Sequence, residues 1–171
     1  MNIALFGFMG VGKSAVGRIL ADRVGFTFVD LDDEIVRRKG KTISAIFEEE
    51  GEASLREVEK EVTKEFASRD HQVIACGGGT VLDDDNLSRL GASSTLILLT
   101  ADPKIILNRV ATNGETRPLL SGDDRPGRIN SLLKSRHPRY IRAADFVVDV
   151  SDGTPESVTE DIILSLGGLG L

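Results

Sequence analysis

The chain has 171 residues, enough for one domain with a buried core. Its 40% hydrophobic and 28% charged residues are ordinary for a globular protein. The formal charge of -6 argues against general binding to nucleic acid or to an anionic membrane, because both require a basic face. We expect a single domain over residues 1–171, a monomer whose partners are small molecules, and anionic ligands held by charges placed locally.

The cysteine content and the N-terminal segment indicate a cytoplasmic protein. Cys76 is the single cysteine and cannot form an internal disulfide, which favours a reducing compartment. The chain start lacks the basic segment of a signal peptide, and no apolar run approaches the roughly 18 residues needed to span a bilayer. Cys76 itself is interpreted as a packed strand-end residue and not as a nucleophile, because no partner is evident.

The first predicted strand, Asn2–Phe6, leads into a complete G-x-x-x-x-G-K-S phosphate loop at residues 7–14, which is followed by a predicted helix at Lys13–Val24. In this strand-loop-helix context, backbone N–H groups and the positive end of the helix favour a di- or triphosphate. Lys13 adds a charge for the outer phosphates, and Ser14 offers a hydroxyl to Mg²⁺. The alternative is a glycine-rich turn that matches by chance.

The second predicted strand, Thr27–Asp30, ends in Asp30-Leu31-Asp32-Asp33. Ligands gather at the carboxyl ends of strands in open α/β sheets, so Asp30 and Asp32 should lie near the phosphate loop. If the chain stays extended, the two side chains point to the same side. One carboxylate could hold the metal and the other could accept a proton from an attacking hydroxyl. The alternative is that they cap a following helix, a role favoured for Asp33.

The remaining pattern alternates helices with strands. It predicts helices at Asp33–Lys39, Ile43–Glu50, Glu52–Ser68, Pro103–Ala111 and Pro155–Leu166, and strands at Gln72–Ala75, Thr95–Leu99 and Phe146–Asp149. Such alternation is typical of an α/β fold with a mostly parallel sheet covered on both faces. Residues 112–127 are rich in charge, Gly and Pro, and they are interpreted as a mobile lid.

Three glycines and three arginines are further candidates. Gly77-Gly78-Gly79 follows a strand, where bare backbone allows close approach of a ligand. Pattern alone favours a solvated helix position for Arg56. Arg117 lies in the predicted lid and could stabilise charge on a transferring phosphate. Arg136 and Tyr140 are four residues apart and would share the face of a helix, although Pro138 makes that geometry uncertain.

Together these segments resemble the shikimate kinase family, whose motifs occur here in order from Ile3 to about Leu166. The matching segments are Gly7-Phe8-Met9-Gly10-Val11-Gly12-Lys13-Ser14, Asp30-Leu31-Asp32, Arg56-Glu57-Val58-Glu59, Gly77-Gly78-Gly79, Arg117-Pro118-Leu119-Leu120 and Arg136-His137-Pro138-Arg139-Tyr140. The resemblance implies a nucleoside monophosphate kinase-like P-loop fold with a five-stranded parallel sheet in the order 2-3-1-4-5. It also implies transfer of the γ-phosphate of ATP to the 3-hydroxyl of shikimate, a step in aromatic amino-acid biosynthesis.

The resemblance also assigns roles to single residues. ATP would contact Arg117 and residues of the phosphate loop, namely Gly10, Val11, Gly12, Lys13, Ser14 and Ala15. Ser14 and Asp30 would place Mg²⁺, and Asp32, Lys13 and Arg117 would take part in catalysis. The substrate-binding helices would lie at about residues 32–62. The residues that bind shikimate would be Asp32, Arg56, Gly78, Gly79 and Arg136. Glu59 would orient Arg56.

Two positions depart from the family pattern. Leu55 stands where the family has a phenylalanine near the substrate ring, beside a second aromatic position that Phe47 matches, and Ala15 replaces a frequent threonine. Arg109 and the segment near Pro155 match the adenine-binding side only loosely. Two alternatives therefore stay open: a kinase of another small polyhydroxy acid such as gluconate, and a nucleotide-binding regulator without transfer activity.

Overall fold

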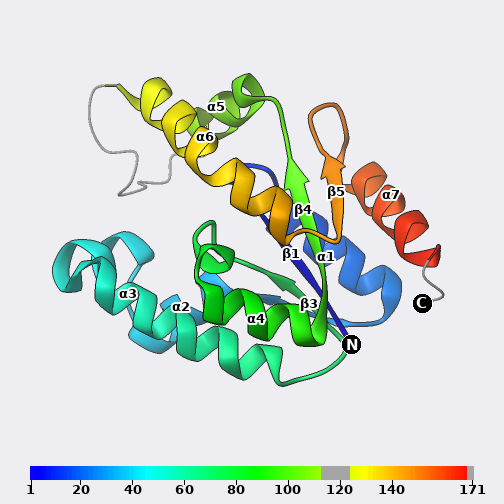
Figure 1. The fold of residues 1–171 in the computed structure, drawn as a ribbon, viewed down its shortest axis with the longest axis horizontal. Helices are drawn as coiled ribbons and strands as arrows, with labels where there is room; N and C mark the ends of the chain where they lie inside the picture. Colours follow the sequence, from blue (N-terminus) through cyan, green and yellow to red (C-terminus); the bar gives the residue numbers. More distant parts are fainter. Residues whose placement is uncertain (113–123, 169–171) are drawn as a thin grey trace.

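A computed structural model describes residues 1–112 and 124–168 of the chain (Figure 1). These residues contain a five-stranded parallel sheet in the order β2-β3-β1-β4-β5, which confirms the predicted fold class. The strands are β1 (Asn2–Gly7), β2 (Thr27–Asp30), β3 (Gln72–Ala75), β4 (Ser94–Thr100) and β5 (Phe146–Asp149). The helices are α1 (Lys13–Val24), α2 (Leu31–Lys39), α3 (Ile43–Ala67), the 3₁₀ helix η1 (Thr80–Leu82), α4 (Asp84–Ser93), α5 (Pro103–Thr112), α6 (Arg125–Ala143) and α7 (Pro155–Gly167).

The centre of the sheet is apolar because helices cover both of its faces. Every residue of β1 and β3 is buried, in agreement with the continuous apolar runs of their sequences. Helix α1 packs against α7 and contacts β2 and β3, whereas α4 and α6 contact β4. Figure 1 shows α4 and α6 in front of the sheet and α1 behind it. Helix α1 approaches β2 closely because Gly17 lacks a side chain: a Cβ there would lie 2.5 Å from the ring of Phe28.

The parallel register brings the strand ends that carry the predicted motifs to one edge. Ile3 of β1 lies opposite Val73 of β3 and Thr95 of β4, and Asp30 of β2 lies opposite Ala75 of β3. The phosphate loop, the second-strand aspartates and the glycine triplet therefore leave the sheet side by side. This confirms the expectation that the carboxyl ends of the first three strands converge.

Several element boundaries differ from the prediction. Helix α2 begins at Leu31 and not at Asp33, and its N-cap is Asp30, whose side chain accepts hydrogen bonds from the backbone N–H groups of Asp32 and Asp33. The chain is therefore already helical at Asp32, so the assumption of an extended Asp30–Asp32 segment is wrong. Helix α3 contains the predicted break as a kink at Gly51, which has a φ of 85°.

Helix α4 has no counterpart among the predicted elements. Its sequence is polar, and its start is defined by the side chain of Asp83, which accepts hydrogen bonds from the N–H groups of Asp85 and Asn86. Helix α6 continues through Pro138. The predicted lid at 112–127 lies mostly outside the described residues, and its two ends, Thr112 and Arg125–Gly127, belong to α5 and α6. No helix within residues 1–112 and 124–168 is long and apolar enough to span a bilayer.

Candidate active site

The phosphate loop connects β1 to α1 and wraps around the ammonium group of Lys13. Gly10 and Gly12 have φ values of 80° and 95°, which lie in the left-handed region that favours glycine. Gly12 is the N-cap of α1 and is not capped by a side chain, so the helix starts at the loop itself. The Nζ of Lys13 donates hydrogen bonds to the carbonyl oxygens of Gly7 and Phe8, both at 3.1 Å. The loop therefore presents a helix N-terminus and a lysine at one point, as the sequence predicts.

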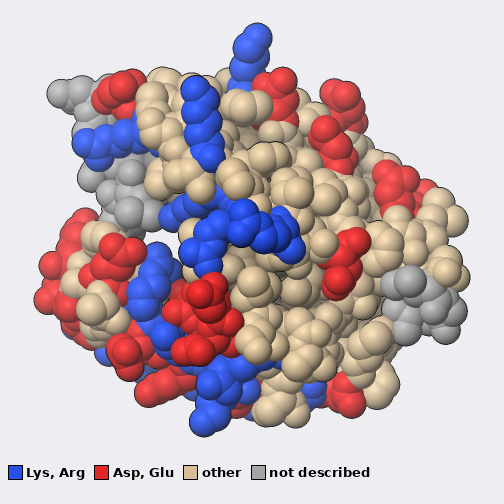
Figure 2. Space-filling model, in the orientation of Figure 1, with Lys and Arg blue, Asp and Glu red and all other residues tan. Residues whose placement is uncertain are grey.

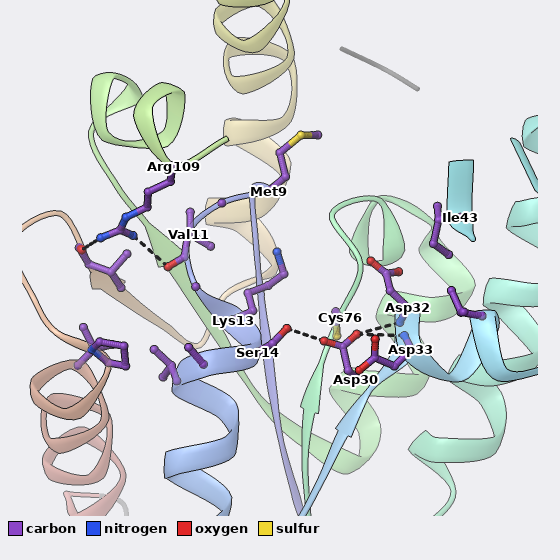
Figure 3. Close-up of a pocket in the computed structure, with 18 of the residues that line it drawn as sticks. Met9, Val11, Lys13, Ser14, Asp30, Asp32, Asp33, Ile43, Cys76 and Arg109 are labelled. Atoms are coloured by element: carbon purple, nitrogen blue, oxygen red, sulfur yellow. Dashed lines mark hydrogen bonds between the residues drawn. The ribbon is translucent and has the colours of Figure 1, made fainter. Parts of the chain in front are cut away.

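A cavity of about 850 Å³ opens beside this loop (Figure 3). It extends from Asp30 and Asp32 on one side to Arg109 on the other, and it continues to the start of α7 at Pro155. Arg109 bridges the phosphate loop and the residue that follows β5, because its guanidinium donates hydrogen bonds to the carbonyl oxygens of Val11 (3.4 Å) and Val150 (3.3 Å). The lining of the cavity includes the residues around the phosphate loop that were predicted to contact ATP, namely Gly10, Val11, Gly12, Lys13, Ser14 and Ala15.

Ser14 and Asp30 meet at the floor of this cavity. The hydroxyl of Ser14 donates a hydrogen bond of 2.5 Å to Oδ2 of Asp30, while Oδ1 of Asp30 caps α2. Both predictions for Asp30 therefore apply together: it caps a helix and faces the phosphate loop. Hydroxyl and carboxylate oxygens are ligands that Mg²⁺ accepts. Within the described residues, no group of three or more His, Cys, Asp or Glu side chains could hold a metal alone.

Cys76 lines the same cavity at the end of β3, yet its side chain is almost fully buried. Burial raises the pKa of the Cys76 thiol, which keeps it protonated and unreactive near neutral pH. The prediction of a packed strand-end residue is confirmed.

The glycine triplet after β3 lies beneath three charged side chains. A Cβ on Gly77 would lie 2.7 Å from Oδ1 of Asp32, and one on Gly79 would lie 2.6 Å from NH1 of Arg56. At Gly78 it would lie 3.3 Å from NH1 of Arg136. The absence of side chains therefore lets three functional groups from α2, α3 and α6 converge over one turn.

Arg56 is half-buried and ion-paired, so the interpretation of a solvated helix residue is wrong. Its NH1 lies 2.8 Å from Oε2 of Glu59, and its NH2 lies 3.3 Å from Oε1 of Glu52. Although burial acts to lower it, the pKa of Arg56 is raised by these carboxylates. Helical periodicity identifies the apolar side of α3, and Arg56 lies next to that side. Its guanidinium packs over Gly79, a contact that the pattern of α3 alone does not predict.

Arg136 is 9% exposed and has a different environment from Arg56. Its NH1 donates a hydrogen bond of 3.4 Å to the carbonyl oxygen of Gly78, and its guanidinium lies 5.9 Å from the centre of the Phe8 ring. No Asp or Glu among residues 1–112 and 124–168 forms an ion pair with it. Tyr140, one turn later on α6, donates its hydroxyl proton to the same Gly78 carbonyl, and burial raises the pKa of Tyr140. The two residues share a helix face, as predicted.

A second, smaller cavity of about 130 Å³ is built from these groups. Its lining includes the apolar side chains of Leu55 and Phe47, the two arginines and the glycine triplet. Asp32 and Lys13 line both cavities, together with Met9 and Ile43. The two aliphatic residues at this junction were not predicted, because nothing in their local sequence distinguishes them from core positions.

Basic side chains gather on the face that carries α6 (Figure 2). This helix contains six Lys and Arg residues and no Asp or Glu in a chain of net charge -6. Of these basic residues, Arg136 is buried and lines the smaller cavity, whereas the other five are exposed. Arg117, the remaining predicted site residue, lies outside the described residues.

Comparison with known proteins identifies the family. The family model described as shikimate kinase matches residues 9–167. A shikimate kinase from Thermodesulfovibrio yellowstonii is 43% identical over 162 residues, covering 95% of this chain and 92% of the relative. The structure of shikimate kinase from Acinetobacter baumannii in complex with shikimate superposes with a TM-score of 0.95 at 35% identity, covering 99% of this chain and 94% of the other.

A gluconokinase from Sinorhizobium meliloti 1021 has a TM-score of 0.58 at 17% identity and covers 98% of this chain and 92% of the other, a likeness of fold alone. The match to shikimate kinases is instead one of sequence, and it spans both cavities and the residues between them. The chain belongs to the shikimate kinase family.

Proposed function

We propose that the protein transfers the γ-phosphate of ATP to the 3-hydroxyl of shikimate, giving shikimate 3-phosphate and ADP. The observation that carries this proposal is the junction of the two cavities. The larger cavity begins at a phosphate loop, the smaller one ends at two arginines, and both are lined by Lys13 and Asp32. A phosphoryl donor in the first and a hydroxylated acid in the second would meet between these two side chains.

The larger cavity supplies the groups that a nucleotide requires. Residues 10–15 would bind its phosphates through backbone N–H groups, and Lys13 would contact the β- and γ-phosphates. Arg109 and Pro155 lie at the far end of the cavity, where the base would reach. Arg117 would close over the phosphates from the predicted lid, a role that stays a prediction for a residue beyond the described part.

Ser14 and Asp30 would hold Mg²⁺, directly or through water. Their oxygens fit its preference for hard ligands, and their hydrogen bond places the hydroxyl and the carboxylate at one point beside Lys13. When bound with ATP, Mg²⁺ neutralises charge that develops on the phosphate oxygens. Asp30 is fixed by the backbone of α2, so its carboxylate is already oriented before any ligand binds.

The smaller cavity has the chemistry that a cyclic hydroxy acid requires. Arginine recognises a carboxylate with paired hydrogen bonds, and Arg136 is a buried cation that would gain a counter-charge from such a ligand. Arg56 would bind the same carboxylate from α3, and Gly78 and Gly79 would contact ring hydroxyls through their backbone. Asp32, beside Gly77, would accept the proton of the attacking hydroxyl.

A coupled assay of ADP formation across small polyhydroxy acids tests the acceptor. We expect kcat/KM to be largest for shikimate, because Leu55 and Phe47 form an apolar slot suited to a ring. A larger kcat/KM for gluconate would refute this choice. Binding of ATP without phosphorylation of any acid would instead favour a non-catalytic regulator.

Replacing Asp32 by Asn tests the catalytic base. The amide keeps the size of the side chain but cannot take a proton, so we expect kcat to fall by about 10²–10⁴-fold while the affinity for ATP stays nearly unchanged. Asp33→Asn is the matched control for kcat, since Asp33 is exposed in the same helical turn and lines the larger cavity but not the smaller one. Equal activity in the Asp32 variant would remove this residue from the mechanism.

We further propose that the protein acts in the cytoplasm as a monomer on these small molecules, without a nucleic-acid or membrane partner. The acidic net charge and the single buried cysteine support this proposal. Sedimentation of the purified protein with and without ATP and shikimate would test the oligomeric state.

A further inference from the structure

Thr80 follows the glycine triplet and is fully buried at the start of η1. Its backbone N–H donates a hydrogen bond to the carbonyl oxygen of Gly77 (3.1 Å), which closes the turn. Its hydroxyl donates a second hydrogen bond, of 2.8 Å, to Oε1 of Glu59 on α3. The side chain of Thr80 therefore connects the glycine turn to α3, and both segments line the smaller cavity.

Glu59 divides its two carboxylate oxygens between two donors. Oε1 accepts from Thr80, and Oε2 accepts from NH1 of Arg56 at 2.8 Å. The residue is 3% exposed, so neither oxygen can exchange its partner for bulk water at little cost. A carboxylate fixed at both oxygens cannot rotate about its terminal bond, and the direction in which it presents Oε2 to Arg56 is thereby defined.

Crowding at Gly77 shows why the donor at Oε1 matters. A Cβ on this glycine would lie 2.7 Å from Oδ1 of Asp32, 3.1 Å from Oε1 of Glu59 and 3.2 Å from Oγ1 of Thr80. Two carboxylate oxygens thus lie around the position that a side chain on Gly77 would take, and like charges in a partly buried site repel. The Thr80 hydroxyl donates its hydrogen bond to Oε1, the Glu59 oxygen that lies close to this position. Without it, Glu59 would lose the contact that holds it in place beside a second carboxylate.

We propose that Thr80 is a positioning residue for the acceptor: through Glu59, its hydroxyl fixes the orientation in which Arg56 covers Gly79. The inference rests on the proposed function, because it takes Arg56 as a ligand of the acceptor's carboxylate. Thr80 touches neither cavity directly, so it acts only through its neighbours.

Thr80→Val removes the hydroxyl and preserves the shape of the side chain. We expect the KM for shikimate to rise by about tenfold, as befits the loss of a hydrogen bond to a charged group, with the KM for ATP unchanged. Thr80→Ser restores the hydroxyl and should return the KM for shikimate to within about threefold of the wild type. The Tm of Thr80→Val should also fall by a few degrees, because Oε1 of Glu59 loses its hydrogen-bond donor. Activity is therefore measured well below the Tm of this variant.

Thr63→Val is the matched control. Thr63 is fully buried, as Thr80 is, and lies on α3 with Glu59, but its hydroxyl has no hydrogen-bond partner among the residues that the structure describes. The same chemical change there should leave both KM values unaltered. Equal increases in the KM for shikimate and for ATP in Thr80→Val would show a merely structural role and overturn the proposal, as would an unchanged KM for shikimate.

A second measurement separates this inference from the proposed function. The Nε–H resonance of Arg56, assigned by its loss in Arg56→Lys, should shift in Thr80→Val and keep its position in Thr80→Ser and Thr63→Val. An unshifted resonance would overturn the positioning role. A shifted resonance in a protein that does not phosphorylate shikimate would support the positioning of Arg56 by Thr80 and refute the proposed reaction.

Discussion

Replacing Arg136 by Met tests whether this guanidinium binds the carboxylate of the acceptor. Loss of one partner from a buried, hydrogen-bonded charge pair costs about 2–5 kcal/mol. Because about 1.4 kcal/mol corresponds to a factor of ten, the KM for shikimate should rise by roughly 30-fold to a few thousand-fold. Methionine keeps most of the apolar stem, so the change removes the charge with little loss of packing.

The same substitution should leave the free protein as stable as before. Among the described residues, the partners of the desolvated Arg136 cation are uncharged: the Gly78 carbonyl at 3.4 Å, the Tyr140 hydroxyl and the Phe8 ring. Removing such a charge is often neutral or stabilising, so we expect a Tm within about 3 °C of the wild type or above it. Arg56→Met should behave differently, because it would leave the buried carboxylate of Glu59 without its cation, at a cost of about 3–5 kcal/mol.

Initial rates and thermal unfolding together test whether Arg136 binds the carboxylate of the acceptor. In the wild type, shikimate added with ADP and Mg²⁺ should raise Tm, and in Arg136→Met this increase should disappear. Arg139→Met is the matched control, since Arg139 is on the same helix but is 48% exposed and pairs with Asp84. If Arg136→Met retained the KM of the wild type, the carboxylate would have to lie elsewhere. If it lost several kcal/mol in the free protein, the guanidinium would be a structural group.

Three further predictions concern the surroundings of the site. Leu55→Phe adds apolar contact beside Phe47 worth about 1 kcal/mol, so it should lower the KM for shikimate by about fivefold, whereas a higher KM would show that the cavity requires leucine. Cys76 should not react with a thiol reagent in the native protein and should react fully in urea; labelling without unfolding would contradict its burial. Hydrogen bonds from Lys39 and Ser54 lower the pKa of Glu50 to about 2, below its value in the unfolded chain. The ionised Glu50 carboxylate therefore stabilises the fold at neutral pH, and this stabilisation is lost as the pH falls from about 4.5 toward 2. Glu50→Gln should therefore show a smaller fall in Tm over this range than the wild type, and an identical fall would contradict the shift.

The sequence predicts best where a local pattern has a direct physical cause. The buried strands read as continuous apolar runs, and the phosphate loop requires glycines at positive φ before Lys13. Such features are set by a few adjacent residues, so no knowledge of distant contacts is needed. The order of the strands came from the family resemblance, since strand sequences alone do not specify their neighbours.

Predictions failed where two local signals competed or where a distant contact decided the outcome. Asp30, Asp32 and Asp33 are all good helix caps, and the choice of Asp30 follows from the end of β2 at its pairing with Ala75. Helix α4 was missed because its exposed residues are polar and its buried positions are few. Pattern alone assigned Arg56 to solvent, because helical periodicity describes a helix face and not the segment that packs on it; the family resemblance placed Arg56 among the substrate-binding residues.

The glycine triplet shows how a weak local signal acquires meaning in three dimensions. Gly77, Gly78 and Gly79 were recognised as bare backbone that a ligand could approach, yet their nearest neighbours are side chains of the protein. These side chains come from α2 and α3, which are neighbours in the sequence, and from α6, which lies much further along the chain. Because each glycine admits a different charged group, the turn fixes a carboxylate beside one arginine from α3 and another from α6. A polar cavity of this kind depends on backbone without Cβ atoms as much as on the groups that line it, and this is the physical reason that the three glycines accompany the two arginines.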